Sequence, residues 1–512
     1  MQSTSKKFKI LDCTLRDGGY YTNWDFSKEI TKNYFVAMEK LPVDYIEIGY
    51  RNLIDSIYRG EYYYSPISSI KLLKQYTTKP LVVILDEKKL EINQIIKLLK
   101  PCLLLVKMVR LAVDPMRLDE ALKKAKEIKK MGFEVAINLM YLSKWINNDE
   151  FIKKIEKIDL EIDYLYLVDS FGGVYPDQIF NLIERLSNKK EFKIGFHGHN
   201  NLELAFSNTL SAIKAGVDIV DSTILGMGRG AGNLKTELIL PYLFNKNIID
   251  YGILSTTLKD FQSLLSKYSW GTNLPYIIAG IHNVPQKKIM DWLISSFYSL
   301  DSIVKSLTSS NSNDLNFKIF NKKNKHEKVL VIGGGPSVIE NIESLKLLID
   351  KDYILLFSST THFKLFNELD NQKYICIVGN EENRIDGLFK ELSNENINLI
   401  LPPKPREIGT FINESLNKYT YELDEFKCYK KSESSHCSVS VEMAYRLSSN
   451  KNVYLTGFDG YDLNKSNEKE KIIFFKNDKV FKMAREKGLN LSSLTPTNYT
   501  NIGLISLYSL ID

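Results

Sequence analysis

The chain has 512 residues, which is longer than one ordinary domain and predicts two or three. Hydrophobic residues make up 44% and charged residues 25%, values that argue against wholesale disorder. The net charge of +6 is small and comes from lysines scattered over predicted helix faces, so we expect no nucleic-acid partner. The five cysteines show no CxxC spacing, which argues against a structural zinc site. No apolar leader or long apolar run is present, so we expect no membrane span and a cytoplasmic protein.

Eight short apolar runs alternate with longer amphipathic stretches between residues 8 and 228. The runs are Phe8–Cys13, Tyr45–Tyr50, Leu81–Leu85, Leu103–Leu111, Val135–Tyr141, Tyr164–Asp169, Lys193–His197 and Ile219–Leu225. Near-continuous apolar strands separated by helical segments are typical of a parallel sheet covered on both faces. Eight such units predict a (β/α)₈ TIM barrel. A doubly wound open sheet is the alternative, but polar residues at the carboxyl ends of nearly all the strands favour closure.

The rest of the chain predicts a helical extension, a linker and a second domain. Residues 230–305 are predicted to be further helices, so the first domain is taken as residues 1–306. Residues 307–325 are polar and rich in lysine, which is typical of a linker. Residues 326–512 begin with KVLVIGGGPSVIEN, a predicted strand, glycine turn and helix. The predicted fold class is therefore α/β, with an N-terminal TIM barrel and a C-terminal Rossmann-like domain.

The predicted strands end in polar residues, which in a barrel of this kind face one shared pocket. These residues are Arg16, Asp17, Glu47, Arg110, Asn138, Asp169, Ser170, His197, His199 and Asn233. The two histidines occupy positions i and i+2 of a strand, so both imidazoles point to the same face. Two imidazoles and a carboxylate, for which Asp17 is the natural candidate, form a ligand set suited to Mn²⁺, Co²⁺, Mg²⁺ or Zn²⁺. The alternative is two polar histidines at the end of a strand.

Two arginines indicate an anionic substrate. Arg16 and Arg110 could bind a carboxylate and an enolate oxygen. A 2-oxo acid can chelate one metal through its carboxylate and carbonyl oxygens, and Lewis-acid polarisation would stabilise the enolate formed when the C3–C4 bond breaks. The alternatives are a salt bridge between Arg16 and Glu47, and an ion pair at the barrel bottom for Arg110.

Six motifs of the first 300 residues resemble one superfamily of metal-dependent barrels. LDCTLRDGGY, IEIG, NLM, VDSFGG, FHGHNNLELAFSN and GMGRGAGNLKTE occur in this order. Together they resemble the HMG-CoA lyase-like (DRE-TIM) metallolyases, and among these the 4-hydroxy-2-oxovalerate aldolases most. The resemblance implies that Asp17, His197 and His199 bind the metal, with Asn233 as a fourth ligand in some members. It also implies that Arg16 stabilises the enolate.

The departures from the family pattern concern the base and the second substrate. The aldolases carry a catalytic histidine where Tyr20 stands, and the condensing members have Glu-Gln where Gly19 and Tyr20 stand. A tyrosine has an ordinary pKa near 10, so Tyr20 would relay a proton, act through the metal-bound water or serve only as a lid aromatic. The segment YSWGTNLPYIIAGIHNVPQKKI resembles the helices that follow the barrel in the aldolases. This favours an aldolase over a Claisen-type condensing enzyme.

The second domain carries a glycine-rich turn. Gly333, Gly334 and Gly335 lie between a predicted strand and helix, where a phosphate could bind near Ser337. The turn is not GxGxxG, and it can equally serve packing alone. With SSHCSVSVEMAYRLSSNKNVYLTGFDGYDL it resembles bacterial sialyltransferase-like and motility accessory factor proteins, which handle CMP-activated sugar acids. That resemblance implies a bound nucleotide, with His436 or Asp459 as site residues.

We therefore predict an aldolase that makes or cleaves a 4-hydroxy-2-oxo acid from pyruvate and an aldehyde, with Arg16, Tyr20, Glu47 and Arg110 as the catalytic candidates. The fusion to the second domain associates it with bacterial surface-polysaccharide or sugar-acid biosynthesis. The alternatives are an acyl-CoA-dependent condensing transferase and a bifunctional aldolase and glycosyl- or nucleotidyl-transferase, or a second domain that is a non-catalytic binding module. We expect a homo-oligomer, because barrels of this superfamily commonly pair.

Overall fold

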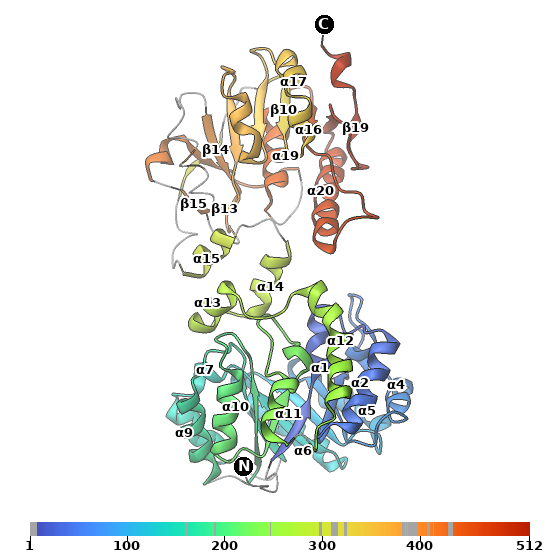
Figure 1. Cartoon of the computed structure of the whole chain (residues 1–512). Coiled ribbons are helices and arrows are strands. Elements are labelled where there is room, and N and C mark those ends of the chain that lie inside the picture. The colour runs from blue at the N-terminus through green and yellow to red at the C-terminus, as the bar shows by residue number, and fades with distance from the viewer. Residues whose placement is uncertain are drawn as a thin grey trace. The chain divides into compact units, whose positions relative to one another are not determined.

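The computed structural model describes residues 8–158, 162–188, 191–245, 247–295, 300–308, 316–321, 325–380, 385, 387, 397–406, 410–412, 414–428 and 434–511. The chain divides into two compact units, Met1–Met290 and Asp291–Asp512 (Figure 1). No described helix is both long and apolar enough to cross a lipid bilayer.

The first unit is a closed barrel of eight parallel strands, as the sequence predicted. The strands are β1 (Lys9–Asp12), β2 (Tyr45–Tyr50), β3 (Leu81–Asp86), β4 (Met108–Val113), β5 (Glu134–Leu139), β6 (Tyr164–Asp169), β7 (Lys193–Gly198) and β8 (Ile219–Ser222). Because β1 pairs with both β2 and β8, the sheet has no edges and the open-sheet alternative is wrong. The fourth strand begins later than predicted, because Pro101 lies in a 3₁₀ turn and Leu104 is fully exposed with a φ of 68°.

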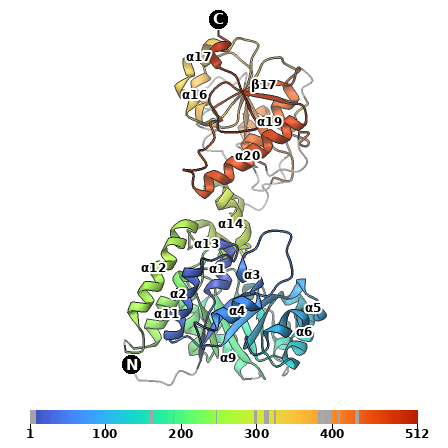
Figure 2. The same cartoon turned by 90° about the vertical axis from the view of Figure 1, so that its right-hand side faces the viewer.

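Helices surround the barrel, and α13 and α14 follow the helices of this outer layer in the chain (Figures 1 and 2). They are α1 (Thr14–Thr22), α2 (Lys28–Lys40), α3 (Glu61–Tyr64), α4 (Ile67–Leu73), α5 (Ile92–Leu99), α6 (Leu118–Lys130), α7 (Leu142–Trp145), α8 (Asp149–Ile155), α9 (Pro176–Ser187), α10 (Ala205–Lys214), α11 (Thr236–Leu243), α12 (Tyr251–Tyr268), α13 (Leu274–His282) and α14 (Gln286–Ser295). Several begin at local sequence signals. The Asp250 side chain caps α12 and the Asn273 side chain caps α13, each by accepting a backbone N–H of the first turn.

The interior of the barrel has an apolar layer and a polar layer, and this arrangement positions the site. Tyr45, Met108 and Ala136 belong to a buried apolar cluster within the barrel. Residues two positions further along each strand point to the same side, so Glu47 and Arg110 lie above that cluster, toward the carboxyl ends. The alternation of the strands therefore delivers charged side chains to the mouth of the barrel.

The second unit is built on a nine-stranded parallel sheet, in the order β19-β18-β17-β10-β11-β12-β14-β16-β9. The strands, with the separate pair β13 and β15, are β9 (Lys318–Ile319), β10 (Val329–Ile332), β11 (Ile354–Phe357), β12 (Lys373–Cys376), β13 (Gly379–Asn380), β14 (Ile397–Leu401), β15 (Thr410–Phe411), β16 (Thr420–Glu422), β17 (Asn452–Thr456), β18 (Asn490–Ser493) and β19 (Gly503–Leu504). The main helices are α15 (Leu300–Thr308), α16 (Ser337–Glu340), α17 (Ile342–Leu348), α19 (His436–Leu447) and α20 (Glu468–Glu486).

The predicted linker of residues 307–325 is in part a strand of this sheet. Lys318 and Ile319 form β9 at its edge and pair with Tyr421 and Glu422 of β16. The lysine-rich composition did not reveal this strand, because an edge strand that faces water can be as polar as a linker. Residues 309–315 and 322–324 of the predicted linker lie outside the described residues.

Two apolar cores cover the two faces of the nine-stranded sheet. Val439 and Val441 of α19 pack with Val329 of β10, whereas Leu345 of α17 packs with Leu330 of the same strand. Successive residues of one strand thus serve opposite cores, which is the pattern of a sheet covered on both sides. Figure 2 shows α16 and α17 apart from α19 and α20. The predicted order of strand, glycine turn and helix after residue 326 is confirmed.

Candidate active site

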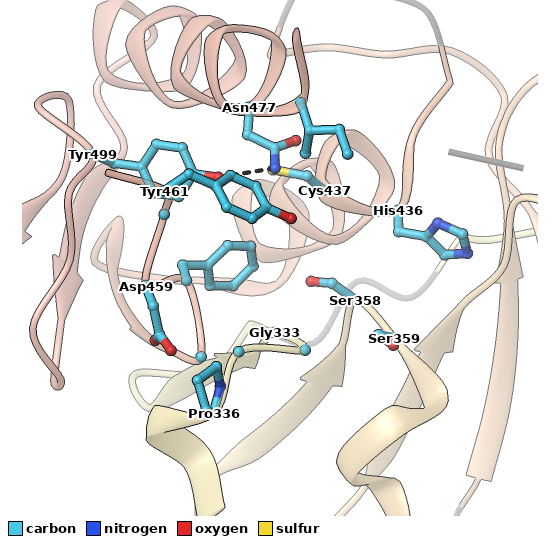
Figure 3. A pocket seen from close by; sticks show the side chains of 16 residues that line it. Gly333, Pro336, Ser358, Ser359, His436, Cys437, Asp459, Tyr461, Asn477 and Tyr499 are labelled. Atoms are coloured by element: carbon cyan, nitrogen blue, oxygen red, sulfur yellow. Dashed lines mark hydrogen bonds between the residues drawn. The ribbon is translucent and has the colours of Figure 1, made fainter. Parts of the chain in front are cut away.

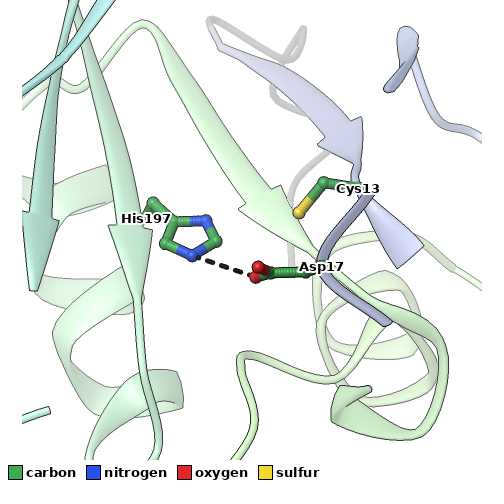
Figure 4. Close-up of side chains that lie close together, drawn as sticks. All are labelled: Cys13, Asp17 and His197. Atoms are coloured by element: carbon green, nitrogen blue, oxygen red, sulfur yellow. Dashed lines mark ion pairs between the residues drawn. The ribbon is translucent and has the colours of Figure 1, made fainter. Parts of the chain in front are cut away.

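A carboxylate and an imidazole face each other at the mouth of the barrel. Asp17 lies in the first turn of α1, directly after β1, and His197 lies near the end of β7. The distance from Asp17 Oδ2 to His197 Nε2 is 3.4 Å, and both side chains are buried. Cys13 is close as well, and its ligand atom lies within 4.8 Å of theirs (Figure 4). Its thiol donates to the backbone oxygen of Ser222, so we take Cys13 as a wall of the site.

Hydrogen bonds from each ring Nδ1 leave the other nitrogen of both histidines for a ligand. His199 Nδ1 lies 2.9 Å from the backbone oxygen of Asp169, which can only accept, so Nδ1 carries the proton and Nε2 the lone pair. His197 Nδ1 lies 2.9 Å from the carboxylate of Asp221. Such partners hold metal-binding histidines in one orientation.

Asn233 adds an unpaired acceptor to the same cluster. Its Nδ2 donates to Asp17 Oδ2 at 2.5 Å, while its buried Oδ1 has no hydrogen-bond partner among the residues that the structure describes. A buried acceptor without a donor is costly, and a cation would satisfy it. The residues therefore fit a divalent metal ion, with Asp17, His197, His199 and Asn233 as the candidate ligands. The structure brings Asp17, His197 and Asn233 into direct contact, and the ring centroid of His199 lies 4.9 Å from that of His197.

The electrostatics of the site also favour a cation. Burial raises the pKa of Asp17, but Arg16 and His197 outweigh it and hold that pKa well below its ordinary value. Burial and the neighbouring His197 lower the pKa of His199 to about 3, so this ring is neutral. For His197, burial lowers the pKa, but Asp17 and Asp221 raise it above its ordinary value overall. The space between Asp17 and His197 thus attracts positive charge.

Arg16 and Glu47 occupy the positions that the sequence predicted for them. Arg16 Nε donates to Glu47 Oε2 at 2.7 Å and Arg16 Nη1 donates to Asp17 Oδ1 at 2.5 Å. The salt bridge between Arg16 and Glu47, which the sequence left as the alternative, is present, and it orients the guanidinium beside the candidate metal ligands. Within the described part of the chain, Glu47 Oε1 has no hydrogen-bond partner. Asp169, at the end of β6, accepts the backbone N–H groups of Gly173 and Val174, and burial raises its pKa to about 7.

Arg110 does not reach the open part of the site. It is 0% exposed, and it donates to Asn138 at 2.8 Å, to Glu47 at 3.3 Å and to Asp221 at 2.7 Å. A guanidinium enclosed in this way supports Glu47 and Asp221 and cannot bind a substrate carboxylate directly. The expected substrate contact is therefore corrected to a supporting role. Arg110 does form ion pairs, but toward the carboxyl ends of the strands and not at the barrel bottom, where the alternative had placed them.

An aromatic wall surrounds the entrance above these residues. Tyr20 Oη lies 2.9 Å from Tyr50 Oη, and the Tyr20 ring packs edge-on against Trp24. The guanidinium of Arg229 lies 4.2 Å from the centroid of the Tyr20 ring. Tyr20 thus lies at the entrance, one helical turn beyond Asp17 on α1.

Sequence reasoning missed three residues of this site, namely Cys13, Asp221 and Arg229. Cys13 and Asp221 lie within predicted apolar strands, and the apolar pattern alone does not show which of their side chains face the inside of the barrel. Asp221 follows Ile219 by two positions, and Ile219 belongs to the inner apolar cluster, so strand alternation could have found it. Arg229 is a single cation among the glycines of GMGRGAGN, which was read only as part of a motif.

The second unit has a cavity of about 610 Å³ beside its glycine turn (Figure 3). Its lining includes Gly333, Gly334, Gly335, Ser358, His436, Asp459, Tyr461 and Tyr499. The cavity lies where β10 has its sequence neighbour β11 on one side and the distant β17 on the other. In open parallel sheets, ligands bind at the carboxyl ends of strands at such a point.

The predicted phosphate position at the turn is filled by a carboxylate. Ser337 N donates to Asp459 Oδ2 at 3.1 Å, and Ser337 Oγ donates to Asp459 Oδ1. The helix that follows, α16, has only four residues and offers little dipole to an anion. Gly333 permits close approach, since a Cβ there would lie 2.3 Å from the backbone oxygen of Gly457.

Comparison with known proteins places the barrel in a family. The HMGL-like family model matches residues 104–265. The crystal structure of the N-terminal domain of a candidate aldolase from Bacteroides vulgatus is similar to this chain, with a TM-score of 0.55 and a sequence identity of 47%. The match covers 58% of this chain and 100% of that one. The N-terminal domain of this chain belongs to the HMGL-like family.

Two curated relatives indicate the kind of chemistry in this HMGL-like domain. The 4-hydroxy-2-oxovalerate aldolase of Geobacillus thermodenitrificans (strain NG80-2) is 28% identical over 244 residues, which are 47% of this chain and 70% of that protein. The oxaloacetate decarboxylase of Mycobacterium tuberculosis (strain ATCC 25618 / H37Rv) is 26% identical over 261 residues, 48% of this chain and 72% of that protein. The HMGL-like domain is thus a metal-dependent lyase of the aldolase kind.

Proposed function

We propose that the HMGL-like domain cleaves or forms a 4-hydroxy-2-oxo acid, with pyruvate as one product and an aldehyde as the other. The observation that carries this proposal is the cluster of Asp17, His197 and Asn233, in which Asp17 Oδ2 and His197 Nε2 lie 3.4 Å apart and Asn233 Oδ1 has no donor among the described residues. Arg16 lies directly beside this cluster. Pyruvate and the 4-hydroxy-2-oxo acid both carry the carboxylate and carbonyl oxygens that such a site would bind.

In the cleavage direction the C3–C4 bond breaks, the C4 hydroxyl loses its proton and C3 gains one. A divalent cation in the site would supply Lewis-acid polarisation of the 2-oxo group. Arg16 uses its Nε and Nη1 for Glu47 and Asp17, which leaves Nη2 to donate to the oxygen that becomes negative. Arg110 holds the carboxylates of Glu47 and Asp221 in place.

We assign to Tyr20 the hydrogen bond with the C4 hydroxyl group of the substrate. Burial, together with Tyr20 itself, raises the pKa of Tyr50 well above its ordinary value, so Tyr50 keeps its proton. Tyr50 then donates to Tyr20 Oη across 2.9 Å, and the hydroxyl hydrogen of Tyr20 can point outward. In this arrangement Tyr20 donates to the aldehyde oxygen in the direction of synthesis.

The test is pyruvate release from a panel of 4-hydroxy-2-oxo acids, with Mn²⁺ or Co²⁺ and with a chelator. His197→Ala removes a ligand, and we expect it to abolish metal-dependent release. His282→Ala is the matched control, because His282 is exposed at the end of α13. Absence of release with every metal would contradict the aldolase proposal. Thiol release from acyl-CoA with a 2-oxo acid would then support the condensing transferase instead.

We further propose that the cavity of the second unit binds a nucleotide or nucleotide sugar. What supports this is its place at the β10 and β17 switch point and its aromatic wall, in which Tyr461 and Tyr499 could stack on a base. Because Asp459 holds the donors of Ser337, the phosphate would lie away from that turn. The sugar-acid resemblance would make the chain bifunctional and connect it with surface-polysaccharide synthesis.

Calorimetric titration of the full-length chain with CMP, AMP and a CMP-linked sugar acid tests this second proposal. Tyr461→Ala should weaken binding by about 10-fold, as expected for a lost stacking contact. Tyr508→Ala is the matched control, since Tyr508 is 65% exposed and does not line the cavity. No heat with any nucleotide would favour a non-catalytic binding module for another ligand.

A further inference from the structure

Arg229 is a cation at the mouth of the barrel without an anionic partner. Its guanidinium lies 4.2 Å from the centroid of the Tyr20 ring. Among the described residues, no carboxylate forms an ion pair with it. Arg16 and Arg110 differ in this respect, because each is paired with two carboxylates. The charge of Asp17 acts on Arg229 from a distance, but the guanidinium has no direct carboxylate contact among the described residues and can donate hydrogen bonds to an anionic ligand.

The backbone around Arg229 is held rigidly. Gly230 O accepts hydrogen bonds from Tyr21 Oη at 3.2 Å and from the backbone N–H of Gly271 at 3.1 Å. The next residue, Ala231, donates to Gln286 Oε1 at 3.1 Å. The same loop carries Asn233, the candidate metal ligand. Arg229 is therefore presented at a defined place relative to the metal site, which is what a specific substrate contact requires.

The floor of the site forces the substrate to extend toward Arg229. Glu47 and Arg110 are 0% exposed and close the barrel beneath the metal ligands. Tyr20 and Arg229 are partly exposed and line the open side. A 2-oxo acid whose C1 carboxylate oxygen and C2 carbonyl oxygen lie at the candidate metal site must direct C4, and every atom beyond it, to this open side.

We propose that the aldehyde partner carries an anionic group, most simply a carboxylate, and that Arg229 binds it. The proposal rests on the aldolase function proposed above and names the class of its second substrate. The substrate is then a 4-hydroxy-2-oxo dicarboxylic acid. Its C1 carboxylate binds at the metal site, and its distal carboxylate accepts hydrogen bonds from the Arg229 guanidinium beside Tyr20. Arg229 is a specificity-determining residue in this arrangement.

Two pairs of compounds of nearly equal size test the proposal on the full-length, Mn²⁺-loaded protein. The cleavable pair is 4-hydroxy-2-oxoglutarate and 4-hydroxy-2-oxopentanoate, which yield pyruvate with glyoxylate and with acetaldehyde. The binding pair is 2-oxoglutarate and 2-oxopentanoate, which lack the 4-hydroxyl group and cannot undergo the cleavage. Each pair differs by a carboxylate in place of a methyl group.

The variants are Arg229→Met, which keeps length and removes the charge, and Arg229→Lys, which keeps the charge. Arg59→Met is the matched control, because Arg59 also lies against aromatic rings, those of Trp24 and Tyr63, but has its own ion pair with Asp55. A charge-assisted hydrogen bond corresponds to about 10- to 100-fold in affinity.

The wild type should prefer the dicarboxylate of each pair by about 10-fold or more. The preference should be seen as a lower KM for the dicarboxylate of the cleavable pair and a lower Kd for the dicarboxylate of the binding pair. Arg229→Met should reduce that preference to near unity, Arg229→Lys should restore part of it, and Arg59→Met should retain it. Equal use of both compounds by the wild type would overturn the proposal, as would equal losses on both compounds in Arg229→Met. Absence of pyruvate from either substrate, with or without the variants, would instead count against the aldolase function itself.

Discussion

Replacement of Arg110 by methionine tests whether the buried charge network holds the barrel together. Arg110 is among the largest fully buried side chains of the described residues and donates to Glu47, Asp221 and Asn138. Methionine fills much of the same space without donors. The substitution therefore leaves Asp221 with His197 as its remaining ionic partner, in a place from which water is excluded.

The expected loss follows from the cost of an unpaired buried charge. Removing one partner of a buried ion pair destabilises a protein by about 3–5 kcal/mol. Unfolding of the 290 residues of the first unit carries an entropy of roughly 0.6 kcal/mol/K, at about 2.1 cal/mol/K per residue. The melting temperature of this unit should therefore fall by roughly 5–8 °C.

Differential scanning calorimetry measures this fall directly, because the transition of the first unit can be identified as the one that Mn²⁺ raises. Arg185→Met is the matched control. Arg185 also bridges two carboxylates, Asp149 and Glu156, but its own side chain is 35% exposed, so water screens its charge and its loss should change the melting temperature much less. Equal melting temperatures for Arg110→Met and Arg185→Met would refute the reasoning.

Two further predictions concern a metal ligand and an acidic residue remote from the site. Gly228→Ala places a Cβ about 2.4 Å from Asn233 Nδ2, so the Asn233 amide must move. The affinity for Mn²⁺, measured by calorimetric titration, should therefore fall about 10- to 100-fold. An unchanged affinity would remove Asn233 from the set of candidate ligands. Burial raises the pKa of Glu87, but hydrogen bonds from Arg117 and Lys124 outweigh it and lower that pKa below 4.5 overall. The carboxylate therefore stabilises the fold above pH 4.5, and its contribution disappears as the pH falls through the lowered pKa. Denaturant unfolding of wild type and Glu87→Gln should give a constant difference from pH 7 to 5 that vanishes at lower pH, and a difference that grows on acidification would contradict the assignment.

Much of the site could be predicted because strand periodicity is a local property. His197 lies in β7 and His199 directly follows the end of that strand, so their i and i+2 spacing turns both imidazoles to one side. The eight apolar runs could be identified because each strand must be buried on both sides. Arg16 and Glu47 also met as expected. Arg16 lies in α1 just after β1 and Glu47 lies within the adjacent strand β2, and the pairing of β1 with β2 brings these positions together.

The sequence by itself determined the barrel, the candidate metal ligands and the strand, turn and helix that open the second unit. Only the tertiary structure decided which buried charged side chains form ion pairs with one another. Arg16, Arg110 and Arg229 look alike in sequence, but packing encloses Arg110 among acceptors from three strands. It leaves Arg229 beside Tyr20, where no described carboxylate forms an ion pair with it. Likewise, the turn at Gly333 looked ready for phosphate until Asp459, more than a hundred residues away, was found against Ser337. The pairing of buried charges depends on distances between remote segments, and local sequence patterns do not contain those distances.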